Sequence, residues 1–265
     1  KIRAFFFILI FSLKNRVLYT YSINYAKSNL YHIIMKNLSD LSLVIPAKEE
    51  PNSLPKVLEE LNEYDCQKII VIEKQDTKTY ESIKNFNCKI IYQSNKGYGN
   101  AIREGINNVK TEYLSIFYAD GSTDPKYLIK MLDIIKSNKI SLVFGTRYAG
   151  GGKSLDDDFI TRVGNFFFSL VGNILFGLNL SDILFTYIIG KKSSFERMKL
   201  FSNNYNLCVE IPIKSKLMGI PYASLPCIER KRIADKKKVK PFKVGLEILF
   251  FIIKCYLNSD FIYRK

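Results

Sequence analysis

The amino-acid sequence predicts an α/β fold with a mostly parallel central sheet flanked by helices. Two observations support this prediction: five short apolar runs occur in the first 150 residues, and the segments between them have apolar residues at helical spacing. Strands that alternate with helices in this way form parallel sheets with right-handed crossovers. The predicted strands are residues 41–46, 68–72, 89–92, 113–119 and 141–145. The intervening helices are predicted to end at residues 64, 86, 107 and 137.

The second half of the chain predicts further helices and two more strands. A largely apolar helix rich in phenylalanine is predicted first, and the break after it contains Asp182. A later helix is predicted to end at Gly219, which is suited to a helix C-cap. The predicted helices are residues 160–178, 195–201 and 209–218, and the predicted strands are residues 183–189 and 221–228.

Composition limits the kind of protein. The chain has 265 residues, 47% of them hydrophobic, which suffices for one large α/β domain. Its formal net charge of +15 predicts an anionic partner, such as nucleotide phosphates, nucleic acid or an acidic membrane surface. Five scattered cysteines without a CxxC pair argue against a zinc site or a disulfide framework. The single histidine, His32, lies outside the patterned core, which disfavours histidine-dependent catalysis.

Both ends of the chain differ from the middle. Residues 4–13 are apolar apart from Ser12 and are flanked by basic residues, but they are about half as long as a bilayer-spanning helix. A basic run, residues 230–243, precedes an apolar stretch, residues 244–256. Each end is interpreted as an amphipathic helix on an anionic membrane. The alternative for the N-terminal end is a poorly ordered extension, and the alternative for the C-terminal end is an ordinary helix packed on the domain. The predicted organisation is an extension (1–40), a central domain (41–240) and a C-terminal apolar helix (241–265).

The fourth predicted strand ends at a carboxylate, Asp120, followed by turn-forming residues. Ligands of open α/β sheets bind beyond the carboxyl ends of the strands. Asp120, with Ser122 and Asp124 close behind it, is therefore a candidate Mg²⁺ or Mn²⁺ site, since these ions take oxygen ligands completed by substrate phosphates. An Asx turn that caps the next helix is the alternative interpretation.

A glycine-containing turn precedes the helix that ends at residue 107. Gly97 and Gly99 would let the backbone approach a nucleotide, with Lys96 near its charge. A Rossmann dinucleotide site is the competing interpretation. The turn lacks the third glycine at the required spacing and does not follow the first strand, which argues against a Rossmann site.

Several motifs occur in one order along the chain. They are residues 44–50 (VIPAKEE), 95–101 (NKGYGNA), 120–125 (DGSTDP), 144–148 (FGTRY), 162–165 (RVGN), Asp182 with Tyr187, and 229–232 (ERKR) with Gly245. This order resembles the inverting family 2 glycosyltransferases with the GT-A (nucleotide-diphospho-sugar transferase) fold. It is most similar to the branch typified by dolichyl-phosphate mannosyltransferase and bacterial polyprenyl-phosphate glycosyltransferases. The resemblance covers about residues 41–252.

The resemblance implies a set of donor-binding residues. The loop with Pro46, Ala47 and Glu49 is expected to meet the nucleotide base and ribose, and Glu73 to contribute a carboxylate to the donor-base pocket. Asp120 matches the second acid of the Asp-x-Asp motif, which contacts the metal and the donor diphosphate in relatives.

The resemblance also implies acceptor-side residues. Arg147 and Arg162 are expected to meet a lipid phosphate, and Arg232 to bind diphosphate or a lipid head group. Asp182 is the candidate general base if the acceptor is a hydroxyl, whereas a phosphate acceptor needs none. Catalysis is thus expected to involve Asp120, Arg147 and Asp182.

The activity implied by the resemblance is inverting transfer of a sugar from a nucleotide-diphosphate sugar to a polyprenyl phosphate, assisted by Mg²⁺ or Mn²⁺. Such an enzyme is expected to be peripheral on the cytoplasmic face of a membrane, with an anionic membrane surface and a separate membrane protein as candidate partners. The alternatives are transfer to a glycan or lipid hydroxyl in cell-surface polysaccharide synthesis, and a non-catalytic sugar-nucleotide binder. Nucleic-acid binding has only the charge in its favour, because the sequence contains no motif for it.

Two positions depart from the family pattern. Tyr118 replaces the first acid of the Asp-x-Asp motif, and Lys74 replaces the second acid of a pair that begins at Glu73. The loss of the first carboxylate weakens the predicted metal site unless another acid compensates. Both departures are compatible with an altered donor preference or a loss of activity.

Overall fold

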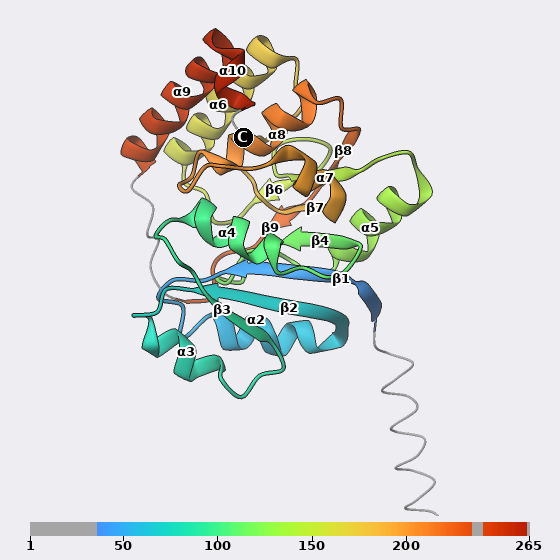
Figure 1. The fold of residues 1–265 in the computed structure, drawn as a ribbon, viewed down its shortest axis with the longest axis vertical. Helices are drawn as coiled ribbons and strands as arrows, with labels where there is room; N and C mark the ends of the chain where they lie inside the picture. The colour runs from blue at the N-terminus through green and yellow to red at the C-terminus, as the bar shows by residue number, and fades with distance from the viewer. Residues whose placement is uncertain (1–35, 235–240, 264–265) are drawn as a thin grey trace, which may run out of the picture. The chain divides into compact units, whose positions relative to one another are not determined.

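The computed structural model describes residues 36–234 and 241–263 (Figure 1). The predictions for residues 1–35 and for residues 235–240 of the basic run lie outside the described residues. Contacts divide the described chain into two compact units: Lys36, Asn37 and Glu63–Asp65 belong to the first, and the remaining residues belong to the second. The candidate site described below lies in the second unit.

The main sheet of the described residues has seven strands in the order β3-β2-β1-β4-β7-β5-β8. The strands are β1 (Lys36–Pro46), β2 (Tyr64–Ile72), β3 (Lys89–Tyr92), β4 (Tyr113–Ile116), β5 (Leu142–Thr146), β7 (Ile188–Lys191) and β8 (Tyr222–Pro226). The pairs β1–β4, β2–β3 and β5–β8 are parallel, whereas β7 is antiparallel to both β4 and β5. The predicted α/β fold with a mostly parallel sheet is confirmed.

The helices cover the faces of the sheet (Figure 1). They are α2 (Leu54–Glu60), α3 (Thr77–Ile83), α4 (Tyr98–Asn107), α5 (Tyr127–Ser137), α6 (Phe159–Phe176), α7 (Lys192–Met198), α8 (Leu207–Leu217), α9 (Pro241–Leu257) and α10 (Ser259–Ile262), with a 3-10 turn, η1 (Leu61–Glu63). In β1, Leu43, Val44 and Ile45 in succession are fully buried. This is why the predicted strands are continuous apolar runs: a parallel sheet covered on both faces has no solvent-facing side.

Two apolar runs of the second half form less strand than predicted. The run 183–189 becomes strand only from Ile188, and its first five residues are irregular. Four of these five residues are apolar or aromatic, and all but Leu184 are buried, so burial and not strand pairing explains the run. The predicted strand 221–228 divides at Cys227 into β8 and β9 (Ile228–Glu229), and β9 pairs with β6 (Lys153–Ser154) in a separate two-stranded sheet.

The glycine turn before α4 packs against the backbone of a later loop. A Cβ on Gly97, whose φ is +122°, would lie 2.1 Å from the carbonyl oxygen of Asn203, and a Cβ on Gly99 would lie 2.4 Å from that of Ser202. The same Asn203 oxygen accepts a hydrogen bond from the amide of Asn100. The two glycines therefore allow close approach of backbone to backbone within the protein.

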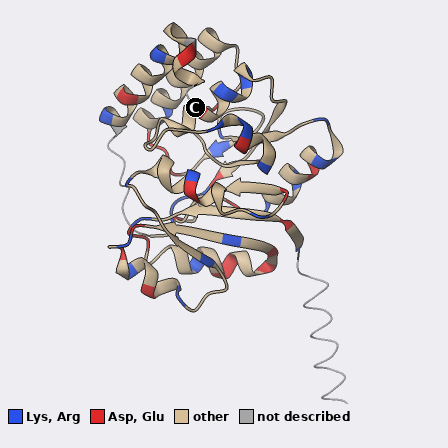
Figure 2. Ribbon diagram, viewed as in Figure 1, with Lys and Arg blue, Asp and Glu red and all other residues tan. Residues whose placement is uncertain are grey.

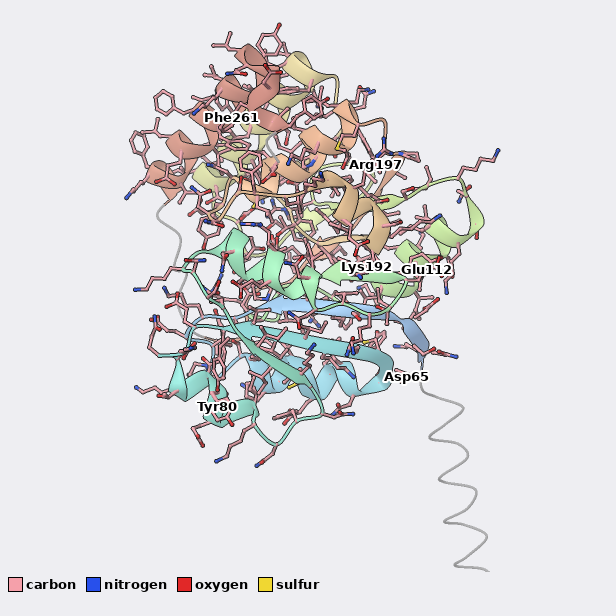
Figure 3. The ribbon with its side chains drawn as sticks, viewed as in Figure 1. Asp65, Tyr80, Glu112, Lys192, Arg197 and Phe261 are labelled. Carbon is pink, nitrogen blue, oxygen red and sulfur yellow. The ribbon has the colours of Figure 1, made fainter. Side chains whose placement is uncertain are left out.

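A buried ion pair holds that later loop in place. The Glu210 carboxylate accepts hydrogen bonds from the amides of Phe201 and Ser202, both at 2.9 Å. Lys214 Nζ lies 2.9 Å from Glu210 Oε1 and donates to the carbonyl of Lys199 at 2.8 Å. The aromatic side chains of Phe201, Phe251 and Phe261 pack together on this part of the protein, and Phe261 is labelled in Figure 3.

Replacing Lys214 by methionine is expected to destabilise the protein by about 3–5 kcal/mol, because it leaves the buried Glu210 without a counter-charge. Urea unfolding followed by circular dichroism measures the loss. Lys216→Met, on the exposed side of the same helix, is the matched control and is expected to change stability by about 0.5 kcal/mol or less. Equal losses of stability in the two variants would contradict the role of the Glu210–Lys214 ion pair in holding the loop.

Candidate active site

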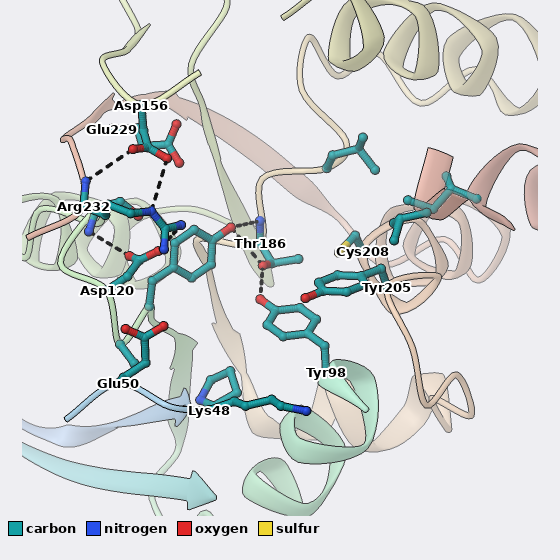
Figure 4. Close-up of a pocket in the computed structure, with 17 residues that line it drawn as sticks. Lys48, Glu50, Tyr98, Asp120, Asp156, Thr186, Tyr205, Cys208, Glu229 and Arg232 are labelled. Carbon is teal, nitrogen blue, oxygen red and sulfur yellow. Dashed lines mark hydrogen bonds and ion pairs between the residues drawn. The ribbon is translucent and has the colours of Figure 1, made fainter. Parts of the chain in front are cut away.

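A cavity of about 320 Å³ lies where β1 and β4 end (Figure 4). One part of its lining is polar and includes Lys48, Glu50, Asp120, Asp156, Glu229 and Arg232. The other part is largely apolar and includes Tyr98, Leu184, Tyr205, Cys208, Val244 and Ile248, the last two from α9. A cavity at the carboxyl ends of parallel strands is where ligands of this class of fold bind.

The loop that carries Asp120 is held by the chain segment that follows β9. Asp120 Oδ1 accepts a hydrogen bond from the amide of Ser122 at 2.9 Å, which forms an Asx turn, although this turn does not cap α5. The carbonyl oxygens of Asp120 and Ser122 accept hydrogen bonds from the amides of Ile233 and Arg230, both at 2.8 Å. The Arg230 guanidinium binds Glu60 with two hydrogen bonds and also donates to the carbonyls of Gly121 and Thr123. The position of Asp120 is thus fixed by residues more than 100 positions away in sequence.

Asp120 and Arg232 form an ion pair inside the cavity. Arg232 Nη2 lies 3.1 Å from Asp120 Oδ2, and Arg232 Nε lies 3.9 Å from Asp156 Oδ2. The Arg232 amide also lies 3.4 Å from Asp156 Oδ1. The guanidinium therefore lies between two carboxylates that belong to different loops (Figure 4).

The three predicted metal ligands are not all brought to the cavity. Asp120 and Ser122 line it, but Asp124 does not. The Asp124 carboxylate instead binds Lys126, through Nζ at 2.7 Å and through the backbone amide at 3.0 Å. Among residues 36–234 and 241–263, no three His, Cys, Asp or Glu side chains are grouped so as to hold a metal ion.

Tyr118 occupies the position of the lost acid and forms part of the cavity wall. Its hydroxyl accepts a hydrogen bond from the amide of Thr186 at 2.9 Å and lies 3.0 Å from Thr186 Oγ1. Tyr98 OH reaches the same Thr186 Oγ1 at 2.6 Å and stacks on Tyr205. Burial raises the pKa of both phenols, Tyr98 and Tyr118, above their ordinary value of 10.0, so both are neutral at pH 7.

Arg147 lies at the end of β5 in a buried cluster of carboxylates. Its Nε and Nη2 bind the two oxygens of Asp182 at 2.7 and 3.1 Å, and its Nη1 lies 3.2 Å from Asp157 and 3.1 Å from Glu229. Burial lowers the pKa of the Arg147 guanidinium, but Asp182 and Glu229 together outweigh burial and leave this pKa above its ordinary value. Arg147 and Asp182 bind each other, and neither lines the cavity.

Glu229 connects this cluster to the cavity. Its Oε2 accepts hydrogen bonds from Arg147 and from Ser154, and the residue lines the cavity. Burial raises the pKa of the Glu229 carboxyl above 4.5, while the nearby Arg147 limits the rise. Sequence reasoning gave Glu229 only as part of a family motif and did not place it in the cavity.

The remaining predicted residues lie in several places. Pro46 lines the cavity around Asp120, and Ala47 is buried and donates its amide hydrogen to the carbonyl of Val71. Glu49 is exposed with a φ of +52°, and its neighbour Glu50 lines the cavity instead. Arg162 is exposed in the first turn of α6.

A second, smaller cavity of about 200 Å³ lies at the carboxyl ends of β2 and β3. Glu73 and Lys96, both predicted to bind the donor, line it with Lys74, Gln75, Gln93, Ser94 and Asn95. Lys48 joins the two cavities, since it lines the first and its Nζ lies 3.0 Å from Glu73 Oε1.

Asp156 and Thr186 are cavity residues that sequence reasoning missed. The acidic run of residues 156–158 is unusual in so basic a chain and was the available signal for Asp156. No local pattern marks Thr186, because its role depends on tyrosines nearly 70 and 90 positions away.

The α/β fold, with a mostly parallel sheet and a cavity at the carboxyl ends of β1 and β4, matches structures of the GT-A type. The model of the family "Glycosyl transferase family 2" matches residues 42–199, and the chain belongs to this family. It is therefore a nucleotide-sugar-dependent glycosyltransferase.

A curated relative and several solved structures are similar to the chain. A dolichyl-phosphate hexose transferase of Haloferax volcanii is 23% identical over 222 residues, covering 83% of this chain and 95% of the relative. Glucosyl-3-phosphoglycerate synthase from Mycobacterium tuberculosis, in complex with Mn²⁺, UDP and phosphoglyceric acid, aligns with a TM-score of 0.66 and 12% identity, covering 81% of this chain and 77% of that one. Its complex with Mg²⁺ and UDP gives a TM-score of 0.64 and 13% identity, covering 82% and 79%. At these identities the structures establish likeness of fold alone.

Replacing Arg147 by glutamine is expected to destabilise the protein by about 3–5 kcal/mol near neutral pH, because three carboxylates lose their shared counter-charge. A carboxyl whose pKa is raised by folding contributes stability below its ordinary pKa and loses that contribution as pH rises through the raised value. Glu229 is such a group, and the variant removes the cation that limits its pKa.

The deficit of Arg147→Gln is therefore expected to be larger at about pH 7.5 than at about pH 5. Urea midpoints of the variant and the parent protein at the two pH values measure it. Arg162→Gln, on the exposed surface of α6, is the matched control. A deficit that is independent of pH would show that Glu229 does not depend on Arg147.

Proposed function

We propose that this glycosyltransferase moves a sugar from a nucleotide-diphosphate sugar to a polyprenyl phosphate, with a divalent cation on Asp120. The observation that supports this most directly is the division of the cavity into two parts. Its polar part has Asp120, Lys48 and Arg232 at the place where a diphosphate would bind, and its apolar part ends at α9. A polar substrate and an isoprenoid chain could thus meet in one cavity. The name of the Haloferax volcanii relative agrees with this acceptor class.

The oxygen ligands that Asp120 offers fit a Mg²⁺ or Mn²⁺ ion that arrives with a nucleotide diphosphate. Mg²⁺ is commonly held by one or two carboxylates, with phosphates and water as the other ligands. Asp120 supplies one carboxylate, and the ion pair that its Oδ2 forms with Arg232 supports an ionised Asp120 at this position. When bound, the ion would neutralise charge on the leaving diphosphate.

The other residues of the cavity would position the two substrates. Lys48 and Arg232 are the cations of the described lining and would contact phosphate oxygens. The neutral tyrosines Tyr98, Tyr118 and Tyr205 form a wall without charge, against which an apolar chain can pack. A phosphate acceptor is already anionic, so its attack on the sugar requires no general base.

A hydroxyl acceptor is the second candidate, and Glu229 is the observation that favours it. This carboxylate lines the cavity, and burial raises its pKa, which makes it a stronger base than an exposed glutamate. The prediction that Asp182 is the base has less support, because both of its carboxylate oxygens bind Arg147.

Replacing Asp120 by asparagine is expected to lower transfer by ~10²-fold or more, since the cation ligand beside the leaving group is lost. Purified protein is given labelled UDP-glucose, UDP-N-acetylglucosamine or GDP-mannose with polyprenyl phosphate and Mn²⁺, and label entering the organic phase is counted. Polyprenol is the matched acceptor that lacks the phosphate. Transfer to polyprenol or to free sugars, with none to polyprenyl phosphate, would replace the proposal by the second candidate.

The exposed faces of α6 and α9 support contact with a membrane. Phe159 and Ile160 of α6 and Phe242 of α9 are each more than three-quarters exposed, at 79%, 77% and 83%. Figure 2 shows the two helices as largely uncharged in that view. In the described part of the chain, only α6 is long and apolar enough to cross a membrane, and one such helix is weak evidence for a span. We therefore propose that these faces lie in a membrane interface, because large exposed apolar patches mark surfaces that contact membranes or other proteins.

The double variant Phe166→Glu and Phe250→Glu is expected to reduce vesicle binding about tenfold, because it places charges on the apolar faces of α6 and α9. Co-sedimentation with vesicles of phosphatidylcholine and phosphatidylglycerol measures binding. Tyr92→Glu, at an exposed position on β3, is the matched control. Unchanged binding of the double variant would show that the protein meets membranes elsewhere or not at all.

A further inference from the structure

The charges of the described cavity lining do not suit phosphate substrates as they stand. Four carboxylates, Glu50, Asp120, Asp156 and Glu229, line the cavity with only two cations, Lys48 and Arg232. Arg232 is the cation bound to Asp120, and Lys48 is bound to Glu73. A diphosphate entering this arrangement would meet an excess of negative charge unless further positive charge arrives with it.

The Arg232 guanidinium occupies the same oxygen that a metal ion would need. Its Nη2 lies 3.1 Å from Asp120 Oδ2, which is the oxygen not used by the Asx turn. A divalent cation bound to that oxygen would lie next to a guanidinium of like charge. The two cations therefore exclude each other at Asp120.

Arg232 contacts two different carboxylates. Its backbone amide and its Nε face Asp156, whereas Nη2, at the tip of the side chain, faces Asp120. Nε is buried and makes no hydrogen bond within the described structure. The guanidinium can thus turn away from Asp120 while the contacts with Asp156 keep the Arg232 side chain in the cavity.

We propose that Arg232 is an internal counter-cation of Asp120 that exchanges with the metal ion of the donor. Before the donor binds, Arg232 neutralises Asp120. When a metal–diphosphate enters, the metal takes Asp120 and the released guanidinium binds the diphosphate, for which its planar fork is suited. Asp156 anchors Arg232 during this exchange. The inference rests on the proposed metal-assisted transfer, and it adds that Arg232 competes with the metal ion for Asp120.

The exchange predicts that metal and nucleotide bind cooperatively. Metal alone must break the Arg232–Asp120 ion pair, and it leaves the displaced guanidinium only the carboxylates of the protein, such as Asp156, which Arg232 already contacts. With a nucleoside diphosphate present, the displaced guanidinium gains a partner, so each ligand strengthens the binding of the other by the same factor. Removing Arg232 should therefore strengthen binding of the metal alone and weaken the coupling.

Electron paramagnetic resonance of free Mn²⁺ tests this directly with the full chain, titrated with and without UDP. Arg232→Gln is expected to bind Mn²⁺ alone at least about fivefold more tightly than the parent protein, and its UDP-dependent gain is expected to be at least about fivefold smaller. Arg232→Lys retains a cation and is expected to bind Mn²⁺ alone weakly, as the parent does. Lys48→Gln removes the other cation of the lining and is the matched control, with Mn²⁺ affinity expected within about twofold of the parent.

Adding Asp120→Asn to Arg232→Gln is expected to abolish the gain in Mn²⁺ affinity. Equal Mn²⁺ affinity and equal UDP coupling in Arg232→Gln and the parent would overturn the exchange and leave the proposed function intact. An equal gain in Arg232→Gln and Lys48→Gln would overturn it as well, because the effect would then be general electrostatics. If the parent protein bound no Mn²⁺ even with UDP, the proposed metal-assisted function would fail and the exchange with it.

Discussion

The buried guanidinium of Arg147 is the interaction on which the candidate site depends. It joins carboxylates from three separate parts of the chain, Asp157, Asp182 and Glu229, to the end of β5. Buried charges of one sign are costly, so these segments can pack together only with the guanidinium between them. Glu229 then leads directly into Arg230 and the residues that hold the Asp120 loop. Arg147 thus positions residues of the cavity lining, such as Glu229, without lining the cavity itself.

Much of the fold was predictable because its signal is local. A strand buried on both faces must be apolar throughout, and residues 43–45 and 69–72, all fully buried, show this in the sequence. The same rule failed at residues 183–187, because a buried irregular segment beside the site has the same composition as a strand. The antiparallel insertion of β7 between β4 and β5 depends on tertiary pairing, for which no local pattern exists.

The site was predictable only in part. Asp120 lies where the end of a strand and a turn indicated it, and it lines the cavity with Pro46, Ser122 and Arg232. Sequence alone could not show that Gly97 and Gly99 face the backbone of residues 202–204, or that Asp182 and Arg147 bind each other. These outcomes depend on partners between about 35 and 106 positions away. The family pattern predicts which residues belong to the site. The tertiary contacts determine whether each of these residues faces the cavity or another part of the protein.

The central claim is that the cavity around Asp120 binds the metal and the diphosphate of the donor. A crystal structure with UDP and Mn²⁺, using the anomalous signal of manganese, tests it most directly. The account predicts manganese coordinated by Asp120, the diphosphate in the polar part of the cavity, and Arg232 turned from Asp120 to the diphosphate. Manganese and UDP bound elsewhere, with the Arg232–Asp120 pair intact, would contradict it.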